Sequence, residues 1–337
     1  MNGYGGSILR VDLTSGKVSK QPTPAEVAQT FIGGRGFGAY FLYTEVPAHD
    51  DPLGPENKLI VSSGPLSGLM VPGAGKCDWT TKSPLTGGYA SSSLGGHFTA
   101  EMRYAGIDSI IFEGISARPV YLVIDDDKIQ LLDAASYWGR GTIEVEVALK
   151  EKHGEDFQVA VIGPGGENGV LFACINHDYG REAGRGGVGA VMGAKGVKAI
   201  VIDMKDLSTR QPKDPEKFKQ ANKVFAAGLK AHPVTGQSLP AYGTNVLTNI
   251  LCEAGAYPTR NFKTGVFEDA AKISGETFAE IEIQRGGIAT QGCHTGCVIQ
   301  CSGTYVAVSY THLRAHETVL DLVCRLLLEK KNNNKSR

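Results

Sequence analysis

Three cysteines stand at intervals of four in the run CHTGCVIQC, at Cys293, Cys297 and Cys301. Closely spaced thiolates are the ligands with which proteins hold soft metal ions and iron–sulfur clusters. If the run were helical, residues four apart would share one face, so the three sulfurs would meet at one centre. A [4Fe–4S] cluster takes four cysteines, of which three commonly come from one short run. We therefore predict a cluster site here, with the fourth cysteine supplied from elsewhere.

Two other interpretations of this run stay open. Buried cysteines are common as small apolar residues, although even spacing beside Gly292 and Gly296 argues against that role. A structural zinc site also uses closely spaced thiolates, and it would give a colourless protein. His294 lies inside the run, where it would either tune or shield a cluster or be exposed to solvent.

Glycine is abundant, with 44 residues, and it gathers in three loops of the first half, over 33–38, 81–96 and 181–189. Glycine lets backbone N–H groups approach a ligand, and Arg35 and Arg185 offer the planar fork that matches phosphate. The first loop follows a predicted helix, which argues against a Rossmann dinucleotide site. The third follows a strand and opens a helix, as phosphate sites do. The loops predict a phosphorylated cofactor, and His177 and Asp178 are either site residues or turn residues.

The elements that position these loops can be read from periodicity and turn residues. Residues 7–20 predict a β-hairpin, and Thr23 is then predicted to cap a helix that has Pro24 in its first turn. Further helices are predicted over 39–46, 97–104, 142–152 and 187–193. The predicted strands are 58–62, 109–113, 120–125, 129–132, 158–162, 171–176 and 198–203.

The composition and the element pattern bound the fold class and the compartment. A chain of 337 residues is long enough for two domains. We predict an α+β protein, with a β-rich domain over 1–206 and a partial helical domain over 214–306 that has helices at 214–231, 240–254 and 275–285. A net charge of −1 gives no reason to expect a nucleic acid partner. No long apolar run or signal peptide pattern is present, so we expect a cytoplasmic protein without membrane association.

The character of the sequence changes near residue 307. The segment that contains SYTHLRAHET resembles the translated read-through of a sequencing adapter. We therefore expect residues 307–337 to be an artefactual tail, and the natural part to be an N-terminal fragment.

Ordered blocks that span nearly all of residues 1–306 resemble the tungsten-containing aldehyde:ferredoxin oxidoreductase family. The blocks are GGRG (33–36), DPLGPENKLI (51–60), GPLSG (64–68), TKSPLTG (81–87), AGRGGVGAVMG (183–193), LPAYGT (239–244) and RNFKTG (260–265). The resemblance implies a β-rich N-terminal domain of this family's type that forms a saddle for a bis-pterin tungsten (or molybdenum) cofactor.

The resemblance also assigns site residues. It implies that the pterin dithiolenes and phosphates are held by Lys76, the segment Ser93-Leu94-Gly95 and the segment Ala183-Gly184-Arg185. Backbone oxygens at Ser93 and Ala183 would hold Mg²⁺ between two phosphates. Lys76 stands where many members have arginine, and Ser93 where they have asparagine. The first cysteine interval is one residue longer than in the best-known members.

The implied reaction is oxidation of an aldehyde, or a related oxo substrate, to a carboxylate. Electrons would pass through the cluster to ferredoxin or an iron–sulfur partner subunit, and the resemblance allows a homodimer of the full-length parent. The fourth cysteine and the acid/base residues would lie beyond residue 306, so we expect no turnover by this fragment. The alternative is a non-catalytic module that carries a cofactor or transfers electrons.

Overall fold

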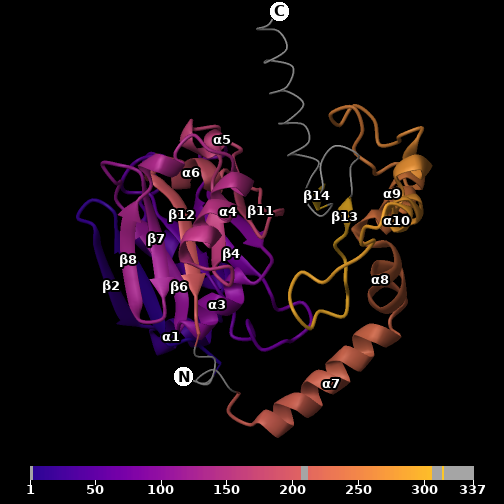
Figure 1. Ribbon diagram of the computed structural model, residues 1–337, viewed down its shortest axis with the longest axis horizontal. Coiled ribbons are helices and arrows are strands. Elements are labelled where there is room, and N and C mark those ends of the chain that lie inside the picture. The colour runs from indigo at the N-terminus through magenta and orange to yellow at the C-terminus, as the bar shows by residue number, and fades with distance from the viewer. Residues whose placement is uncertain (1–2, 206–211, 306–312, 315–337) are drawn as a thin grey trace, which may run out of the picture. The chain divides into compact units, whose positions relative to one another are not determined.

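The computed structural model describes residues 3–205, 212–305 and 313–314, and the chain divides into two compact units, Met1–Pro215 and Glu216–Arg337. The predicted α+β class is confirmed, because two mixed sheets are followed by a helical region (Figure 1). Within the described ranges, no helix combines the length and the apolar character that crossing a bilayer requires. The predicted tail lies outside the described residues, apart from Leu313–Arg314.

The first unit contains two six-stranded sheets. The first sheet has the order β2-β1-β6-β3-β4-β5 and the second has the order β8-β7-β12-β9-β10-β11. The strands are β1 (Ser7–Asp12), β2 (Lys17–Pro22), β3 (Leu59–Ser62), β4 (Cys77–Lys82), β5 (Tyr89–Leu94), β6 (Ile107–Glu113), β7 (Val120–Asp125), β8 (Lys128–Asp133), β9 (Gln158–Val161), β10 (Ile175–His177), β11 (Arg181–Ala183) and β12 (Val197–Asp203).

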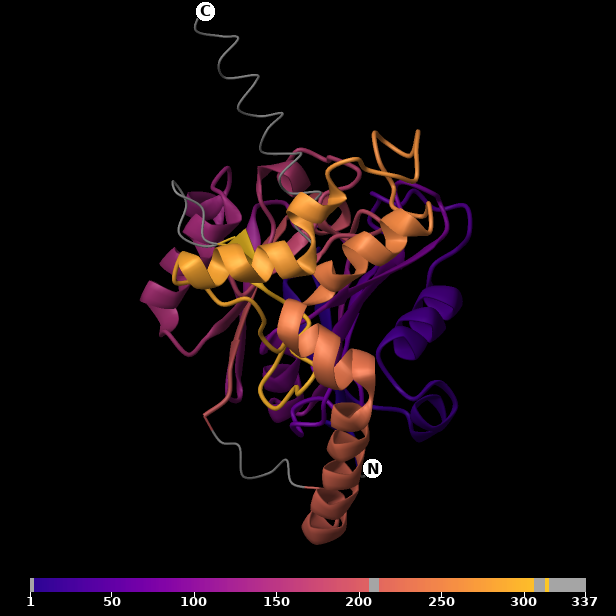
Figure 2. The ribbon, with the colours of Figure 1, turned by 90° about the vertical axis from the view of Figure 1, so that its right-hand side faces the viewer.

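Helices α1 and α2 cover the outer face of the first sheet and α4 that of the second, whereas α3 and α6 pack into the core between the sheets. Between the sheets lies a core built from alternate residues of the strands, such as Trp79 and Phe112 of the first sheet and Leu122 and Ile200 of the second. Figure 2 shows the indigo helices α1 and α2 on one side of the strands and the magenta helices on the other. The helices of this unit are α1 (Ala25–Phe31), α2 (Arg35–Glu45), α3 (Phe98–Tyr104), η1 (Ala135–Tyr137), α4 (Thr142–His153), α5 (Pro164–Glu167) and α6 (Val188–Ala194).

The two sheets repeat one topology. In each half the first strand pairs parallel with the sixth, and every other pairing within the sheet is antiparallel. Shifting α3 and β6 by 90 residues gives α6 and β12 with identical bounds, and the same irregularity follows Ile107 and Val197. Between the segments 96–113 and 186–203, five residue pairs at this offset are identical: Gly96/Gly186, Ala100/Ala190, Met102/Met192, Gly106/Gly196 and Ile110/Ile200. The unit is therefore built from two equivalent halves.

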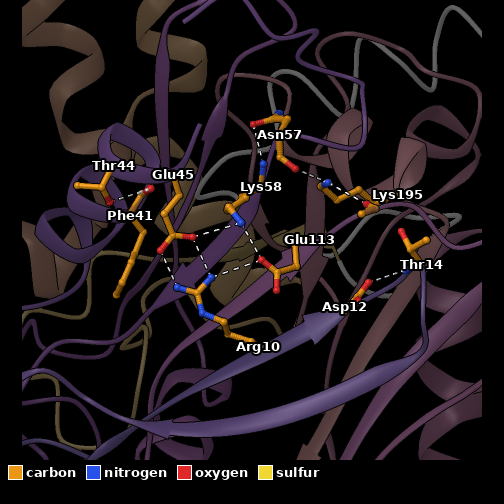
Figure 3. A network of polar contacts seen from close by, with 11 residues as sticks. Arg10, Asp12, Thr14, Phe41, Thr44, Glu45, Asn57, Lys58, Glu113 and Lys195 are labelled. Carbon is orange, nitrogen blue, oxygen red and sulfur yellow. Dashed lines mark hydrogen bonds and ion pairs between the residues drawn. The ribbon is translucent and has the colours of Figure 1, made fainter. Parts of the chain in front are cut away.

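Polar groups join the halves and brace the outer face of the first sheet (Figure 3). Arg10 donates to Glu45 of α2 at 2.8 Å and to Glu113 at 3.4 Å, and Lys58 lies between the same two carboxylates. Lys195, from the second half, donates through Nζ to the carbonyl oxygens of Asn57 and Gly114 in the first half. Burial lowers the pKa of Lys195 to about 8.

The second unit is helical. Its long first helix, α7, is amphipathic and none of its residues is buried. The elements are α7 (Pro215–Ala231), the π-helical turn η3 (Val234–Ser238), α8 (Leu239–Tyr242), η4 (Thr244–Val246), α9 (Leu247–Glu253), η5 (Ala270–Ile273), α10 (Gly275–Gln284) and the short strands β13 (Thr304–Tyr305) and β14 (Leu313–Arg314).

Candidate cofactor and metal sites

The hairpin of β4 and β5 is the framework of the first candidate site. Cys77, Trp79 and Leu94 point into the core between the sheets, so the alternate residues Asp78, Ser91 and Ser93 point to the outer face. Both Ser91 and Ser93 donate their hydroxyl hydrogens to Asp78, the latter at 3.1 Å. These polar cross-strand contacts stabilise a pair of strands that has few apolar residues.

The third glycine loop packs against β5. The backbone N–H of Arg185 donates to the Ser92 hydroxyl at 3.0 Å, and Ser83 donates to the carbonyl of Gly186 at 2.9 Å. Gly186 has a φ of +71°, and a Cβ placed there would lie 2.5 Å from the Cβ of Ala90. Glycine is therefore required at 186 both for the backbone conformation and for the close approach.

Ser93 and Ala183 occupy equivalent positions in the two halves. Ser93 is the last residue but one of β5, and Ala183 is the last residue of β11. Their residue numbers differ by 90, the same offset that relates α3 to α6. β5 and β11 are the end strands of their sheets, and the contacts at Arg185 and Gly186 bring them together. Two equivalent backbone segments thus meet at one place in the unit.

The meeting point combines positive charge with accessible backbone, which are the groups that a phosphorylated ligand needs. The Ser93 hydroxyl donates its hydrogen to Asp78, and the Ser93 backbone carbonyl offers a further oxygen of the kind that a cation takes as ligand. A Cβ added at Gly184 would meet no atom within 4 Å, so the backbone there borders open space. Exposed Arg185 and exposed Lys76 supply positive charge at the two segments. The Leu94 side chain is fully buried in the core, so a ligand would contact this residue through its backbone.

The first glycine loop reaches the same hairpin. Arg35 donates through Nε to the Ser91 hydroxyl at 2.9 Å, and this nitrogen lies 3.7 Å from Asp78 Oδ2. The Tyr89 hydroxyl donates to the carbonyl of Arg35 at 3.3 Å. The first and third glycine loops therefore both contact the hairpin of β4 and β5, and the second glycine loop is largely part of that hairpin.

His177 serves the core instead of a site. It is fully buried, its Nδ1–H donates to the Val159 carbonyl at 3.0 Å, and its Nε2 accepts the backbone N–H of Phe98 at 3.3 Å. These bonds require the neutral imidazole, and burial lowers its pKa to about 4. The site role considered for His177 is therefore wrong, because both ring nitrogens hold backbone groups.

The cysteine run of the second unit is a closed loop of turns, so the helical arrangement considered for it is wrong. Gln291 and Ser302 exchange backbone hydrogen bonds at the two ends of the loop. Gly296 and Gln300 have φ values of +87° and +48°, which end any helical run. The turns nevertheless bring cysteine and histidine side chains close together, as a metal site requires.

Two of the three predicted cysteines lie together. The ligand atoms of Cys293, His294 and Cys297 all lie within 4.8 Å of one another, and both thiols are buried. Cys301 is half-buried, and its carbonyl accepts hydrogen bonds from the backbone N–H and the hydroxyl of Thr244, at 2.9 and 2.8 Å. Three thiols on one pinned loop suit an iron–sulfur cluster or a soft metal ion.

Some functional features could not be read from the element pattern. The strands β4 and β5 were not predicted, and with them the buried carboxylate Asp78 was missed. A comparison of the sequence with itself at an offset of 90 residues was the available signal, because Gly96, Ala100 and Met102 recur as Gly186, Ala190 and Met192.

Comparisons with known proteins agree with this arrangement. The model of the aldehyde ferredoxin oxidoreductase N-terminal domain matches residues 8–204, and that of domains 2 and 3 of the same enzyme matches residues 220–320. A tungsten-containing aldehyde ferredoxin oxidoreductase of Pyrococcus abyssi is 49% identical over 280 residues, which cover 83% of this chain and 46% of the relative. One from Pyrococcus horikoshii is 45% identical over 298 residues, 88% of this chain and 49% of the relative.

A solved structure shares the fold over almost the whole chain. The active site complex BamBC of benzoyl coenzyme A reductase, in complex with 1,5-dienoyl-CoA, has a TM-score of 0.74 and 30% identity, and the match covers 93% of this chain and 49% of that one. The chain spans about half the length of the curated relatives it matches. The two sheets, the glycine loops and these matches together show that the chain belongs to the aldehyde ferredoxin oxidoreductase family.

Proposed function

We propose that the whole protein oxidises an aldehyde, or a related oxo substrate, to a carboxylate at a bis-pterin tungsten centre. Electrons then pass through a [4Fe–4S] cluster to ferredoxin or to an iron–sulfur partner subunit. Support comes from the family and from relatives that are named as tungsten-containing aldehyde ferredoxin oxidoreductases.

The observation that carries this proposal is the meeting of two equivalent strand ends at β5 and β11. A bis-pterin cofactor has two similar halves, each with a phosphate, so a protein unit built from two similar halves matches it. The hydrogen bond from the Arg185 N–H to the Ser92 hydroxyl and that from the Ser83 hydroxyl to the Gly186 carbonyl hold the two strand ends together. A single nucleotide cofactor would have no use for this duplicated arrangement.

In this proposal the residues of the first unit bind and orient the cofactor. Lys76, Gly95 and Arg185 contact the pterins and their phosphates, and Leu94 and Gly184 contribute backbone. The carbonyl oxygens of Ser93 and Ala183 would hold a Mg²⁺ ion, since oxygen is the ligand that Mg²⁺ prefers, and the ion would offset phosphate charge. When bound, the tungsten centre supplies the two-electron oxidation, with the oxygen atom coming from water. The protein positions the centre and excludes competing reactions.

The cysteine loop has the second role. Cys293, Cys297 and Cys301 would hold the cluster, with a fourth cysteine from elsewhere in the whole protein. Burial of Cys293 and Cys297 keeps water from the sulfurs, and the Thr244 contacts fix the backbone at Cys301. His294 lies close enough to the two buried sulfurs to influence them.

Metal analysis of the protein expressed from its complete gene, anaerobically and with tungstate, tests this function. We expect tungsten or molybdenum, pterin, and the broad visible absorbance of an iron–sulfur cluster, together with aldehyde-dependent reduction of a viologen dye. A colourless zinc protein would overturn the cluster assignment. A protein with a cluster but without pterin and without turnover would favour the electron-transfer module instead.

A further inference from the structure

Arg35 is held in a fixed position by a buried carboxylate. It is the first residue of α2, and its Nε donates to the Ser91 hydroxyl at 2.9 Å. The same nitrogen lies 3.7 Å from Asp78, whose side chain is only 9% exposed. Asp78 in turn accepts the hydroxyl hydrogens of Ser91 and Ser93. One edge of the guanidinium is thus anchored on the hairpin of β4 and β5.

The other edge of the guanidinium is available to a ligand. The Arg35 side chain is 68% exposed, and its two Nη groups have no hydrogen-bond or ion-pair partner in the part of the chain that the structure describes. A guanidinium carries five N–H donors in one plane, and Nε uses only one of them. The remaining fork has the geometry that binds two oxygens of a phosphate or carboxylate at once.

The backbone around Arg35 is also fixed. The N–H of Gly34 donates to the Ser63 carbonyl at 2.8 Å, and the Arg35 carbonyl accepts the Tyr89 hydroxyl. A Cβ added at Gly34 would meet no atom within 4 Å, so open space borders the loop where Arg35 begins the helix. An exposed arginine on a mobile surface would show neither the anchored Nε nor this pinned backbone.

The position of Arg35 connects it to the proposed cofactor site. Asp78 bonds both Ser91, which holds Arg35, and Ser93, whose backbone belongs to that site. The two serine hydroxyls donate hydrogen bonds to Asp78, and Arg35 offsets its negative charge. An anion that approaches the exposed Nη groups therefore meets the positive guanidinium before the carboxylate. The hairpin therefore presents a cation next to the strand that carries Ser93.

We propose that Arg35 binds a phosphate group of the pterin cofactor through its two Nη groups, with Asp78 as the positioning residue. This inference rests on the proposed function, since the cofactor supplies the phosphate. The chemistry recognised is a phosphoryl dianion, and a free phosphate ion would present the same oxygens. Arg35 would then be a cofactor contact on the first glycine loop, in addition to those on the second and third.

The first experiment titrates the whole chain with inorganic pyrophosphate by isothermal calorimetry. Arg35→Ala should weaken binding about tenfold or more, because the bidentate contact is lost. Arg35→Lys should recover only part of the affinity, since lysine keeps the charge and lacks the fork. Arg118→Ala is the matched control, because Arg118 is also exposed but lies on the loop before β7. Equal affinities for Arg35→Ala and wild type, or no binding by wild type, would overturn the inference.

The second experiment separates this inference from the proposed function. The protein expressed from its complete gene is denatured, and its released pterin is measured by fluorescence. Arg35→Ala should lower the pterin content severalfold with the unfolding transition unchanged, and Asp78→Asn should lower it less. Normal pterin content in Arg35→Ala would overturn the inference and leave the function intact. If wild type held no pterin while pyrophosphate binding still depended on Arg35, the function would fail, and the site would be one for a free phosphate ion.

Discussion

The packing of the third glycine loop on β5 can be tested by adding one methyl group. In Gly186→Ala the new Cβ would lie 2.5 Å from the Cβ of Ala90, at a φ of +71°. The left-handed conformation costs a residue with a Cβ roughly 1–2 kcal/mol. Overpacking of a tight contact costs about 1–3 kcal/mol more. The free energy of unfolding should therefore fall by about 2–5 kcal/mol, and the melting temperature of a unit of this size by about 5–15 °C.

Gly184→Ala is the control for this variant, two residues away on the same loop. A Cβ at 184 meets no atom within 4 Å, and its φ lies outside the left-handed region. Its stability should stay within about 0.5 kcal/mol of wild type. The added methyl would instead enter the space that we assign to the cofactor, so Gly184→Ala should lose pterin without losing stability.

Urea unfolding followed by far-UV circular dichroism measures the stabilities, and pterin fluorescence measures the content. If Gly186→Ala were as stable as wild type, the contact between the third loop and β5 would not exist as described. If Gly184→Ala lost as much stability as Gly186→Ala, the space beside Gly184 would already be filled by protein, and the cofactor would have to lie elsewhere.

Three further predictions test other parts of the molecule. Burial lowers the pKa of His177 to about 4, so between about pH 6.5 and 4 only the unfolded state binds a proton at this residue. The free energy of unfolding should therefore fall by about 3 kcal/mol as the pH is lowered through that window. His177→Gln should flatten this part of the profile of urea-derived stability against pH. In Arg10→Met the carboxylates of Glu45 and Glu113 keep only Lys58 as a nearby cation. The free energy of unfolding should fall by about 1–2 kcal/mol in the same assay. An unchanged stability would mean that these ion pairs behave as solvent-exposed ones. After anaerobic reconstitution with iron and sulfide, Cys297→Ser should lose most of the visible absorbance of a cluster. Cys77→Ser should keep this absorbance, because Cys77 is a core thiol whose pKa is raised to about 12 by burial. Equal loss in both variants would contradict the assignment of the cluster to the cysteine loop.

Strong periodicity made much of the framework predictable. The hairpin of β1 and β2, the strands β7 and β12 and the helices α3, α4 and α6 agree closely with the predicted ranges. Each of these segments has apolar residues spaced for one buried face, or a continuous buried run. The α+β class followed from the element pattern and the family from ordered sequence blocks, and both are confirmed.

Tertiary contacts decided the features that the sequence did not reveal. Thr23 was predicted to cap α1, but its hydroxyl donates to Asp108, 85 residues away, and no side chain caps that helix. The strands β4 and β5 contain Thr80, Ser91 and Ser92, and such polar residues read as loop until α2 and the third glycine loop cover them. The strand predicted over 171–176 begins later, as β10, because glycine packing of α6 occupies residues 173–174.

The site residues were predictable to different degrees. The cysteine spacing predicted a cluster site that stays a prediction, and turns instead of a helix bring Cys293 and Cys297 together. The roles of Ser93 and Ala183 came from resemblance to the family and stay predictions. What the structure adds is a physical reason for them, since the two residues end equivalent strands of a duplicated unit.

The most direct test of the account is the ratio of pterin to tungsten, or to molybdenum, in the protein expressed from its complete gene under anaerobic conditions. Two equivalent protein halves predict the ratio of a bis-pterin complex, and Ser93 and Ala183 predict magnesium in the same preparation. A preparation with a single pterin for each metal ion, or with no pterin at all, would contradict the claim that the duplicated halves each hold one half of the cofactor.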